Sequence, residues 1–296
     1  MDIINSPDHP GIPLLHLIED FGGCIREFPV YTFDKKINCA AYWPTIDYDI
    51  WKRNRISWKL NRNTRFKSIS DVRKYYGKQQ RKYPWEKKIR KAVWRGSSTG
   101  NAKNWRDLPR SKLVNASALN LDILDVGYYM FLQRSDKEVA EMEREFGTKE
   151  RISMESFQRY MAVIDIDGNA WSSRFPTLLC QNSVVLKVDY MFDTYLYQSL
   201  TPWIHYVPVK SDMSDLVEKV TYVLDKKNEQ DVRQIINEAN EWCISHYPSI
   251  KLAHDMMGTL IDYAGLLNAS GLEWQEQWGR LKLEKGYNSS ILVQDY

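Results

Sequence analysis

The chain has 296 residues and a mass of 34.9 kDa, a length that predicts one large domain or two domains of ordinary size. Its hydrophobic content of 43% and charged content of 27% are those of a globular protein, which excludes a disordered or fibrous chain. No apolar run approaches the roughly 18 residues that a membrane-spanning helix needs, and the N-terminus lacks the pattern of a signal peptide. The four scattered cysteines match no metal-ligand spacing, so we expect free thiols and a cytoplasmic location.

The net charge is unevenly distributed along the chain. Residues 51–95 contain 17 Lys or Arg and two acids, a local charge of +15, whereas the whole chain carries +3 and the remainder therefore −12. Aromatic residues are interspersed with the basic ones. This segment is compatible with a groove for a diphosphate or an anionic glycan, with a nucleic-acid surface, or with a solvated basic face.

The first third of the chain predicts short strands and one helix. Apolar segments predict strands at 14–18, 28–33 and 37–43, the first of which runs into Glu19 and Asp20 before a glycine turn. Further on, Ser70 and Asp71 are suited to cap a helix over residues 72–76.

From residue 91 the chain alternates between strand and helix patterns. The predicted strands are 92–94, 121–126, 161–166, 183–188 and 203–209. The predicted helices are 104–118, 138–146, 153–160, 172–180, 192–200, 212–225 and 229–246. This order predicts a doubly wound α/β domain over 91–250. Residues 1–90, a helix near 252–267 and the C-terminal tail would form a second lobe.

Ligands of such sheets bind beyond the carboxyl ends of the strands. The first predicted strand of this domain leads into the small residues RGSSTG (95–100), and a helix carrying Arg106 follows. Small residues ahead of a helix N-terminus let backbone N–H groups approach a phosphate, although such loops are often simple turns. Segments 167–174 and 189–193 and His205 come after later predicted strands. We therefore expect an anion site built from these loops.

Four motifs in this part of the chain resemble the CAP10 domain of glycosyltransferase family 90, which includes capsule xylosyltransferases and protein O-glucosyl- and O-xylosyltransferases. They are WRGSSTG (94–100), RYMAVIDIDGNAWSSRFPTLL (159–179), SVVLKVDYMFD (183–193) and LTPWIHYVPVKSDMSDL (200–216). The resemblance covers about 90–250 and is faint in the N-terminal third. The compact length suggests the short virus-encoded members of the family.

The resemblance implies an α/β fold of GT-B type, with two Rossmann-like lobes and the donor site in the cleft between them. The donor lobe would be 91–250, and the acceptor-side lobe 1–90 plus 251–296. The implied reaction is inverting and metal-independent, and it moves xylose, or next glucose, from a UDP-sugar to a hydroxyl of a glycan acceptor. No cofactor, nucleic acid or membrane span is expected.

Sugar transfer from a nucleotide requires charge stabilisation on the departing diphosphate. By resemblance, the planar guanidinium groups of Arg106 and Arg174 would bind the diphosphate, because each can hold two oxygens. Asp193, where the family usually has glutamate, would bind the ribose, and His205 would contact substrate. The loop would add backbone or hydroxyl donors from four residues, which are Gly96, Ser97, Ser98 and Thr99.

A general base must take the proton of the acceptor hydroxyl, and a carboxylate on the other lobe is suited to this role. Asp20 is the preferred candidate because relatives carry an aspartate after a comparable early strand, although a proline follows it there and Phe21 follows here. Glu19, Asp47 and Asp49 are the alternatives.

Other interpretations are open. Asp165 and Asp167 form a DxD motif after an apolar strand, the pattern by which GT-A enzymes hold Mn²⁺, although a turn role is preferred here. The basic segment 51–95 could belong to a nucleic-acid-binding protein. A sugar-binding relative without catalytic activity is the third alternative.

Overall fold

The computed structural model describes residues 68–189, 192–246 and 248, four short strands before residue 45, and scattered residues between 251 and 265. No helix among these residues is long and apolar enough to cross a membrane.

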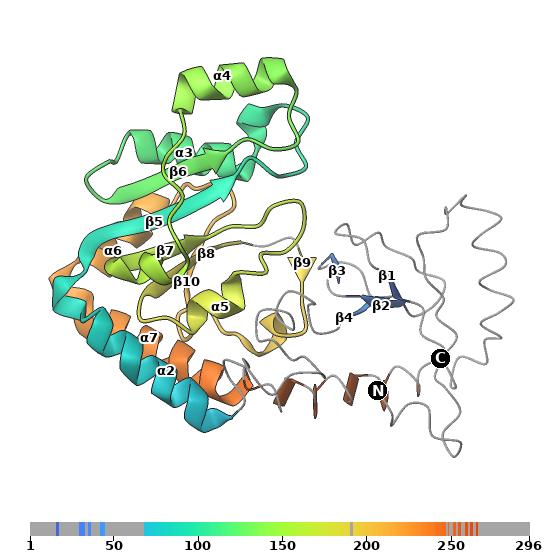
Figure 1. Ribbon diagram of the computed structural model, residues 1–296, viewed down its shortest axis with the longest axis vertical. Coiled ribbons are helices and arrows are strands. Elements are labelled where there is room, and N and C mark those ends of the chain that lie inside the picture. Colours follow the sequence, from blue (N-terminus) through green and yellow to red (C-terminus); the bar gives the residue numbers. More distant parts are fainter. Residues whose placement is uncertain are drawn as a thin grey trace, which may run out of the picture.

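A five-stranded parallel sheet forms the centre of the molecule (Figure 1). Its strands lie in the spatial order β10-β8-β7-β5-β6. Their bounds are β5 (Ile89–Ser97), β6 (Leu124–Met130), β7 (Tyr160–Asp165), β8 (Val184–Val188) and β10 (Val207–Val209). The chain enters at β5, adds β6 on one side, and then adds β7, β8 and β10 on the other. The predicted α/β class with a parallel sheet is therefore confirmed, and the strand order reverses between β5 and β7.

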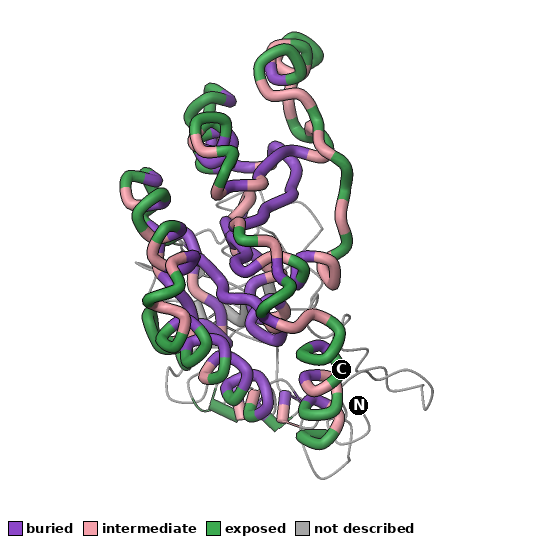
Figure 2. Tube along the Cα trace, turned by 90° about the vertical axis from the view of Figure 1, so that its left-hand side faces the viewer, coloured by how far each residue is buried: buried purple, intermediate pink, exposed green. Residues whose placement is uncertain are grey.

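Helices cover both faces of the sheet (Figure 1). One face carries α3 (Pro109–Ala118) and α6 (Leu216–Leu224), and the other carries α2 (Ile69–Lys82), α5 (Phe175–Leu179) and α7 (Glu229–His246). Because both faces are covered, the inner strands β7 and β8 are buried along almost their whole length, and Figure 2 shows the buried stretches in purple. Continuous apolar runs are what such strands require.

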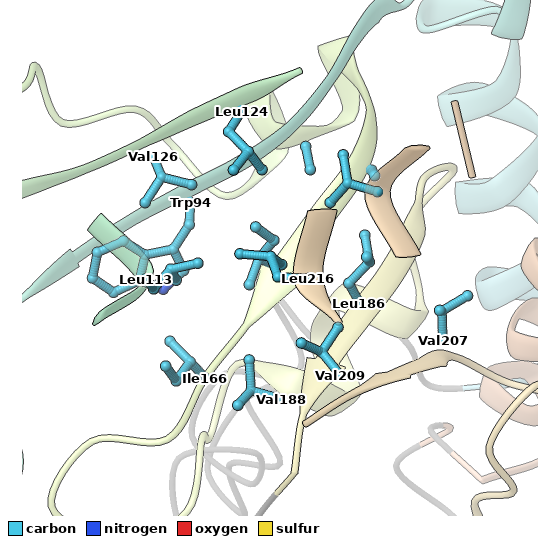
Figure 3. Close-up of a cluster of buried hydrophobic side chains, with 14 of the residues drawn as sticks. Trp94, Leu113, Leu124, Val126, Ile166, Leu186, Val188, Val207, Val209 and Leu216 are labelled. Atoms are coloured by element: carbon cyan, nitrogen blue, oxygen red, sulfur yellow. The ribbon is translucent and has the colours of Figure 1, made fainter. Parts of the chain in front are cut away.

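Strand alternation divides the side chains between two cores. Trp94, Ile164 and Leu186 pack with Leu113 of α3 and Leu216 of α6, in the cluster of Figure 3. On the opposite face, the intervening valines of β5, β7 and β8 pack against Phe175 of α5 and Trp242 of α7; these valines are Val93, Val163 and Val185. Residues two apart in a strand share a face, so each strand contributes to both cores.

Helix α2 lies next to α7, and its Val72 and Tyr76 belong to the second core. Ser68 caps this helix in a capping box with Asp71, two residues before the expected cap at Ser70. Helix α2, although it precedes residue 91, therefore packs in the same core as the sheet. The division into donor and acceptor lobes stays a prediction.

The early part of the chain contributes a small parallel sheet. Its order is β1 (His16–Leu17), β2 (Val30–Thr32), β4 (Tyr42–Pro44), and each strand lies within or overlaps a predicted one. A separate short strand, β3 (Lys35–Lys36), pairs antiparallel with β9 (Phe192–Asp193), which follows β8 (Figure 1).

Several predicted elements are shorter or of another type. The predicted helix 192–200 is wrong, because β9 and a single 3-10 turn, η4 (Tyr197–Ser199), occupy it. Strand 203–209 begins only at Val207, since Trp203 has a φ of +64° in the preceding turn. The other elements are η1 (Trp85–Lys87), η2 (Trp105–Asp107), α4 (Asp136–Phe146), η3 (Glu155–Arg159) and η5 (Lys226–Asn228).

Cys180 and Cys243 form a disulfide that joins the end of α5 to α7, with their Cα atoms 5.6 Å apart. The prediction of free thiols is therefore wrong for this pair. The two helices share one core, which brings together cysteines that lie 63 residues apart. Cys24 and Cys39 lie outside the described residues.

Candidate functional site

The strand order reverses between β5 and β7, and the loops that follow these two strands face each other at the carboxyl edge of the sheet. Polar side chains converge between these two loops. Arg110, in the first turn of α3, lies between the two loops. Its Nε donates to Asp167 O at 2.9 Å, and its Nη1 donates to Ser97 O at 3.0 Å and to Thr99 Oγ1 at 2.6 Å. Arg110 is 9% exposed, so it holds the two loops together from inside.

A second arginine lies at the same end of β5. Arg174, which immediately precedes α5, donates from Nη1 to Arg95 O at 2.8 Å. Burial, followed by repulsion from Arg174, lowers the pKa of Arg110 to about 10. The two guanidinium groups are thus close enough to oppose each other's charge. An anion bound beside them would relieve this repulsion.

Close approach of the two loops depends on Gly168. A Cβ there would lie 2.9 Å from Arg110 Nη2 and 3.0 Å from Thr99 Oγ1. Gly96, by contrast, is required by packing, because a Cβ there would lie 2.2 Å from the ring of Trp94. The glycines of the predicted loop therefore serve the fold, and Gly168 is the one that shapes the site.

The DxD motif forms a buried ion cluster with Lys187. In the register of the sheet Asp165 lies opposite Lys187, and Lys187 Nζ lies 2.9 Å from Asp165 Oδ2 and 2.6 Å from Asp167 Oδ1. Ser172 completes the cluster, since its Oγ donates to Asp165 Oδ1 at 2.6 Å and its backbone N–H to Asp167 Oδ1 at 3.1 Å. Three of the four carboxylate oxygens therefore accept hydrogen bonds from the protein.

Burial and the neighbouring charges act in opposite directions on the pKa values within this cluster. Burial alone would lower the pKa of Lys187, but Asp165 and Asp167 outweigh it and raise the pKa. Burial raises the pKa of Asp167, against the pull of Lys187. The lysine ammonium sits on both carboxylates, where a chelated cation would have to sit. This donor set does not fit Mn²⁺, and the motif orders the turn after β7.

Of the predicted phosphate ligands, Arg106 lies away from these two loops, and its predicted role stays a prediction. Its guanidinium stacks over Trp105, 4.0 Å from the ring centroid, and pairs with Glu145 at 2.7 Å and Glu141 at 3.5 Å. Trp105 packs against Phe146 of α4. Because Arg106 is the next residue, it also lies beside α4 and away from the loop. Arg110, four residues later, takes the predicted position.

The hydroxyls of the predicted loop have different partners. Ser98 Oγ donates to Leu132 O at 2.9 Å and accepts from Leu132 N at 2.7 Å, so it ties β5 to the segment after β6. Thr99 Oγ1 accepts from Arg110, and Ser97 contributes its carbonyl to the same arginine. Thr99 is the only one of the three hydroxyl side chains that contacts the described site.

Asp193 and His205 lie on other parts of the fold. Asp193 is the second residue of β9, and its Oδ2 accepts from Gln198 Nε2 at 3.4 Å, a weak contact. His205 precedes β10 and so lies at the amino end of that strand. Its Nδ1 accepts from Thr201 N at 2.9 Å, and burial lowers its pKa. The structure gives His205 a role in the turn and no place beside the arginines.

The predicted base Asp20 and its alternatives Glu19, Asp47 and Asp49 lie outside the described residues. Strand β1 ends at Leu17, three residues before Asp20. The predicted roles of these carboxylates stay untested.

Many basic side chains of the predicted basic segment make contacts within the protein. Arg95 pairs with Asp125 at 2.8 Å, and Lys88 is buried with its Nζ on Ser183 Oγ at 3.1 Å and on the carbonyl of Gln158. Burial lowers the pKa of Lys88 to about 7. The exposed cations of residues 68–95 are mostly on α2, so this part of the segment offers less charge to a nucleic acid than the sequence suggests.

Sequence reasoning missed Arg110. Pro109 at the first helical position is a signal for the start of α3, and it places Arg110 in the first turn, beside the loop. Lys187 carried a second signal, because a lysine inside the apolar strand 184–188 requires a buried counter-charge.

Comparison with known proteins gives a family match. The family model described as Glycosyl transferase family 90 matches residues 29–277. Protein O-glucosyltransferase 2 of Danio rerio is 31% identical over 163 residues, which cover 55% of this chain and 30% of that protein. Protein O-glucosyltransferase 1 of Rattus norvegicus is 25% identical over 81% of this chain and 54% of its own length. The chain therefore spans about a third to a half of these relatives.

Among solved structures, TarM aligns with a TM-score of 0.43 and 11% identity over 58% of this chain and 35% of its own.

A viral protein is also similar in sequence. This uncharacterised protein of Invertebrate iridescent virus 3 is 26% identical over 66% of this chain and 19% of its own length.

Proposed function

Because this chain belongs to glycosyltransferase family 90, we propose that it transfers a sugar from a UDP-sugar to a hydroxyl of a glycan acceptor. Xylose is the first donor sugar proposed and glucose the second, and the names of the matched O-glucosyltransferases support glucose. The reaction inverts the anomeric centre and needs no metal ion. The fold proposed for the whole protein is GT-B.

The observation that carries this proposal is the pair of guanidinium groups at the carboxyl end of β5. The departing UDP bears negative charge on its diphosphate, and catalysis requires positive groups fixed where that charge develops. Arg110 is held by the carbonyl groups of both loops, and Arg174 lies against β5 at 2.8 Å. Arg174, which is the less buried of the two, is the proposed diphosphate ligand, with Arg110 holding the loops.

The ion cluster supports chemistry without a metal. The Lys187 ammonium compensates one of the two carboxylates of the DxD motif, so Arg110 and Arg174 together keep a net positive charge beside it. Asp167 Oδ2 is buried and accepts no hydrogen bond from the described residues. It is a suitable acceptor for a hydroxyl of the sugar.

The N-terminal segment would supply the base. The antiparallel pair β3–β9 joins this segment to the chain just after β8. Asp193 lies on β9, where a carboxylate can bind the ribose hydroxyls, and Asp20 follows β1 and would take the acceptor proton as the glycosidic bond forms.

Arg174→Ala tests the proposed site through UDP binding measured by isothermal titration calorimetry. Hydrogen bonds to a charged group contribute about 1.5–3 kcal/mol, so we expect affinity to fall about 10- to 100-fold. The matched control is Arg106→Ala, which removes a surface arginine paired with α4 and should leave affinity within about twofold. Equal losses in the two variants would overturn the placement of the diphosphate.

Turnover of a panel of UDP-sugars in EDTA tests the chemistry. Hydrolysis or transfer from UDP-xylose or UDP-glucose at the rate seen with added Mn²⁺ is expected. Activity that EDTA abolishes and Mn²⁺ restores would refute the metal-free mechanism. Thermal melting of the protein with UDP is the second measurement. If UDP does not raise the melting temperature of the protein, the nucleotide-sugar proposal itself is refuted.

A further inference from the structure

Helix α2 carries a row of cations on its outer side. The helix lies at the edge of the described domain, at the lower left of Figure 1, and packs against α7. Its buried residues are Val72, Tyr76 and Gln79. Its exposed cations, here called the basic face, are Arg73, Lys74, Lys78 and Arg81. At about 100° per residue these cations fall within an arc of about 140° opposite the buried residues, and they extend over about 12 Å of the helix.

The cations of the basic face are not compensated by carboxylates. None of the four forms an ion pair with a described residue. Instead, Lys78 has a lysine one turn before it and another one turn after it, at Lys74 and Lys82, and like charges at this spacing repel. On α7, by contrast, Arg233 lies 3.5 Å from Glu229, one turn earlier. A negatively charged surface over the basic face would relieve the repulsion.

The acidic side chains beside the basic face are already engaged. Asp71 is the one acid in α2, and its Oδ2 accepts hydrogen bonds from Ser68 N at 3.1 Å and from Ser68 Oγ at 3.0 Å in the capping box. Glu155 lies 2.6 Å from Lys82 at the end of the helix. An anion that approaches the basic face therefore meets the cations without a competing carboxylate from α2.

Two features of the helix distinguish between anionic partners. Its aromatic residues, Tyr75 and Tyr76, are half-buried and buried, so α2 offers no exposed ring on which the bases of a single-stranded nucleic acid can stack. Ile69, one turn before Arg73, is 52% exposed. An apolar side chain beside cations can insert into the headgroup region of a bilayer, whereas a soluble polyanion offers it no apolar environment.

The cations of the basic face are also not fixed by contacts. None of them makes a hydrogen bond to a described residue, so no such bond holds them in an arrangement that matches one defined ligand. A bilayer presents many mobile headgroups, which can arrange themselves around the protein. Clusters of about four to eight basic residues on an amphipathic helix are typical of binding to anionic lipids.

From these observations we propose that the basic face of α2 binds the anionic surface of a lipid bilayer. The helix lies along the surface, the cations approach the headgroups, and Ile69 enters the headgroup region. The attachment is peripheral, and it weakens with salt because exposed charges are screened. It does not require the proposed transferase activity.

The test is co-sedimentation of the full chain with lipid vesicles. One set of vesicles is phosphatidylcholine with about one third phosphatidylserine, which supplies the negative surface potential, and the other is phosphatidylcholine alone. The chain should bind the first set in about 0.1 M NaCl and release it in about 1 M NaCl, because the Debye length falls from about 10 Å to about 3 Å. It should not bind the second set in either salt.

Two double substitutions map the binding. Each basic residue at an anionic surface strengthens binding about fivefold, so Lys74→Gln with Lys78→Gln should weaken vesicle binding about 30-fold. The matched control is Lys112→Gln with Lys137→Gln, which removes the same charge from α3 and α4 at the other end of the view in Figure 1. The control should leave vesicle binding within about threefold. All four lysines are exposed, so neither variant removes a packed side chain.

The competing results are distinct. Equal losses in the two double variants would overturn the placement on α2. Binding to phosphatidylcholine alone, or binding that persists in about 1 M NaCl, would overturn the electrostatic mechanism. Binding of the parent chain to heparin or polyuridylic acid but not to the anionic vesicles would overturn the bilayer as the partner.

The donor site and the basic face give separate results. Arg174→Ala should leave vesicle binding unchanged, because Arg174 lies beside β5 and not on α2. Lys74→Gln with Lys78→Gln should leave UDP affinity within about twofold, because both side chains are exposed on α2.

Discussion

The buried lysine of the ion cluster offers a direct test of the reasoning about charge. Lys187→Met keeps the length and the apolar stem of the side chain but leaves Asp165 and Asp167 without their cation. Lys187 and Asp165 side chains are 0% exposed, and Asp167 is 16% exposed. Removing one partner of a buried ion pair costs about 3–5 kcal/mol, because the remaining charge stays buried. We expect a loss of this size in the free energy of unfolding, measured by urea denaturation at pH 7.

The loss should depend on pH in a defined direction. Without the lysine, burial raises the pKa of Asp167 still further above its value in the unfolded chain. The folded state then binds more protons than the unfolded state, so the deficit shrinks as the pH is lowered from 7 toward 5. Asp165→Asn combined with Lys187→Met should recover part of the loss, because one uncompensated charge is removed.

Lys149→Met provides the matched control. Lys149 pairs with Asp125 at 3.0 Å, but its side chain is 39% exposed, so we expect a loss of about 1 kcal/mol or less. A Lys187→Met loss no greater than that of the control would refute the account of the cluster. A deficit that stays constant between pH 7 and 5 would refute the account of its charges.

Three further predictions concern other parts of the fold. Hydrogen bonds from Tyr160, Lys149 and Arg95 outweigh burial and lower the pKa of Asp125 to about 2. The stability that the ionised Asp125 contributes is therefore present above about pH 4 and lost toward pH 2. In urea titrations, Asp125→Asn should cost about 1–2 kcal/mol at pH 6 and almost nothing at pH 2. Cys243→Ser opens a cross-link between residues 63 apart and should cost about 2–4 kcal/mol, and dithiothreitol should lower the melting temperature of the parent to that of the variant. Gly168→Ala should cost about 1–3 kcal/mol by calorimetry and weaken UDP binding, since the pinned Arg110 must move; an unchanged melting temperature would contradict the close packing of the two loops.

The parts of the fold that follow from local pattern were predictable. Helix 229–246 agrees with the structure to the residue, because its apolar face repeats with the helical period and is buried along its length. Strands β7 and β8 agree within one residue at each end, since a run buried on both faces is apolar without interruption. The helix prediction for 192–200 failed because its apolar residues follow helical spacing, whereas Leu196 and Tyr197 are buried by tertiary contacts outside any α-helix.

The site was less predictable because it depends on which way a chain turns. The sequence placed an arginine after the glycine loop, but η2 intervenes and Trp105 turns toward α4. Arg106 accompanies it, and the next arginine along the helix reaches the loop. The disulfide depends likewise on the packing of α5 against α7, which no spacing of cysteines in the sequence reveals.

Lys187 also explains how the proposed anion site can contain two aspartates. Asp165 and Asp167 lie close enough to affect the pKa of Arg110, and by themselves they would cancel the positive potential of the two arginines. The lysine compensates one carboxylate, so the five charged groups retain a net charge of +1 at the carboxyl edge. Lys187→Met makes this sum neutral and should weaken UDP binding, although the buried ammonium is saturated by its carboxylates and contacts no diphosphate. Lys187 is therefore a positioning and charge-balancing residue, and rescue of UDP affinity by Lys187→Arg, which restores the charge, distinguishes this role from a merely structural one.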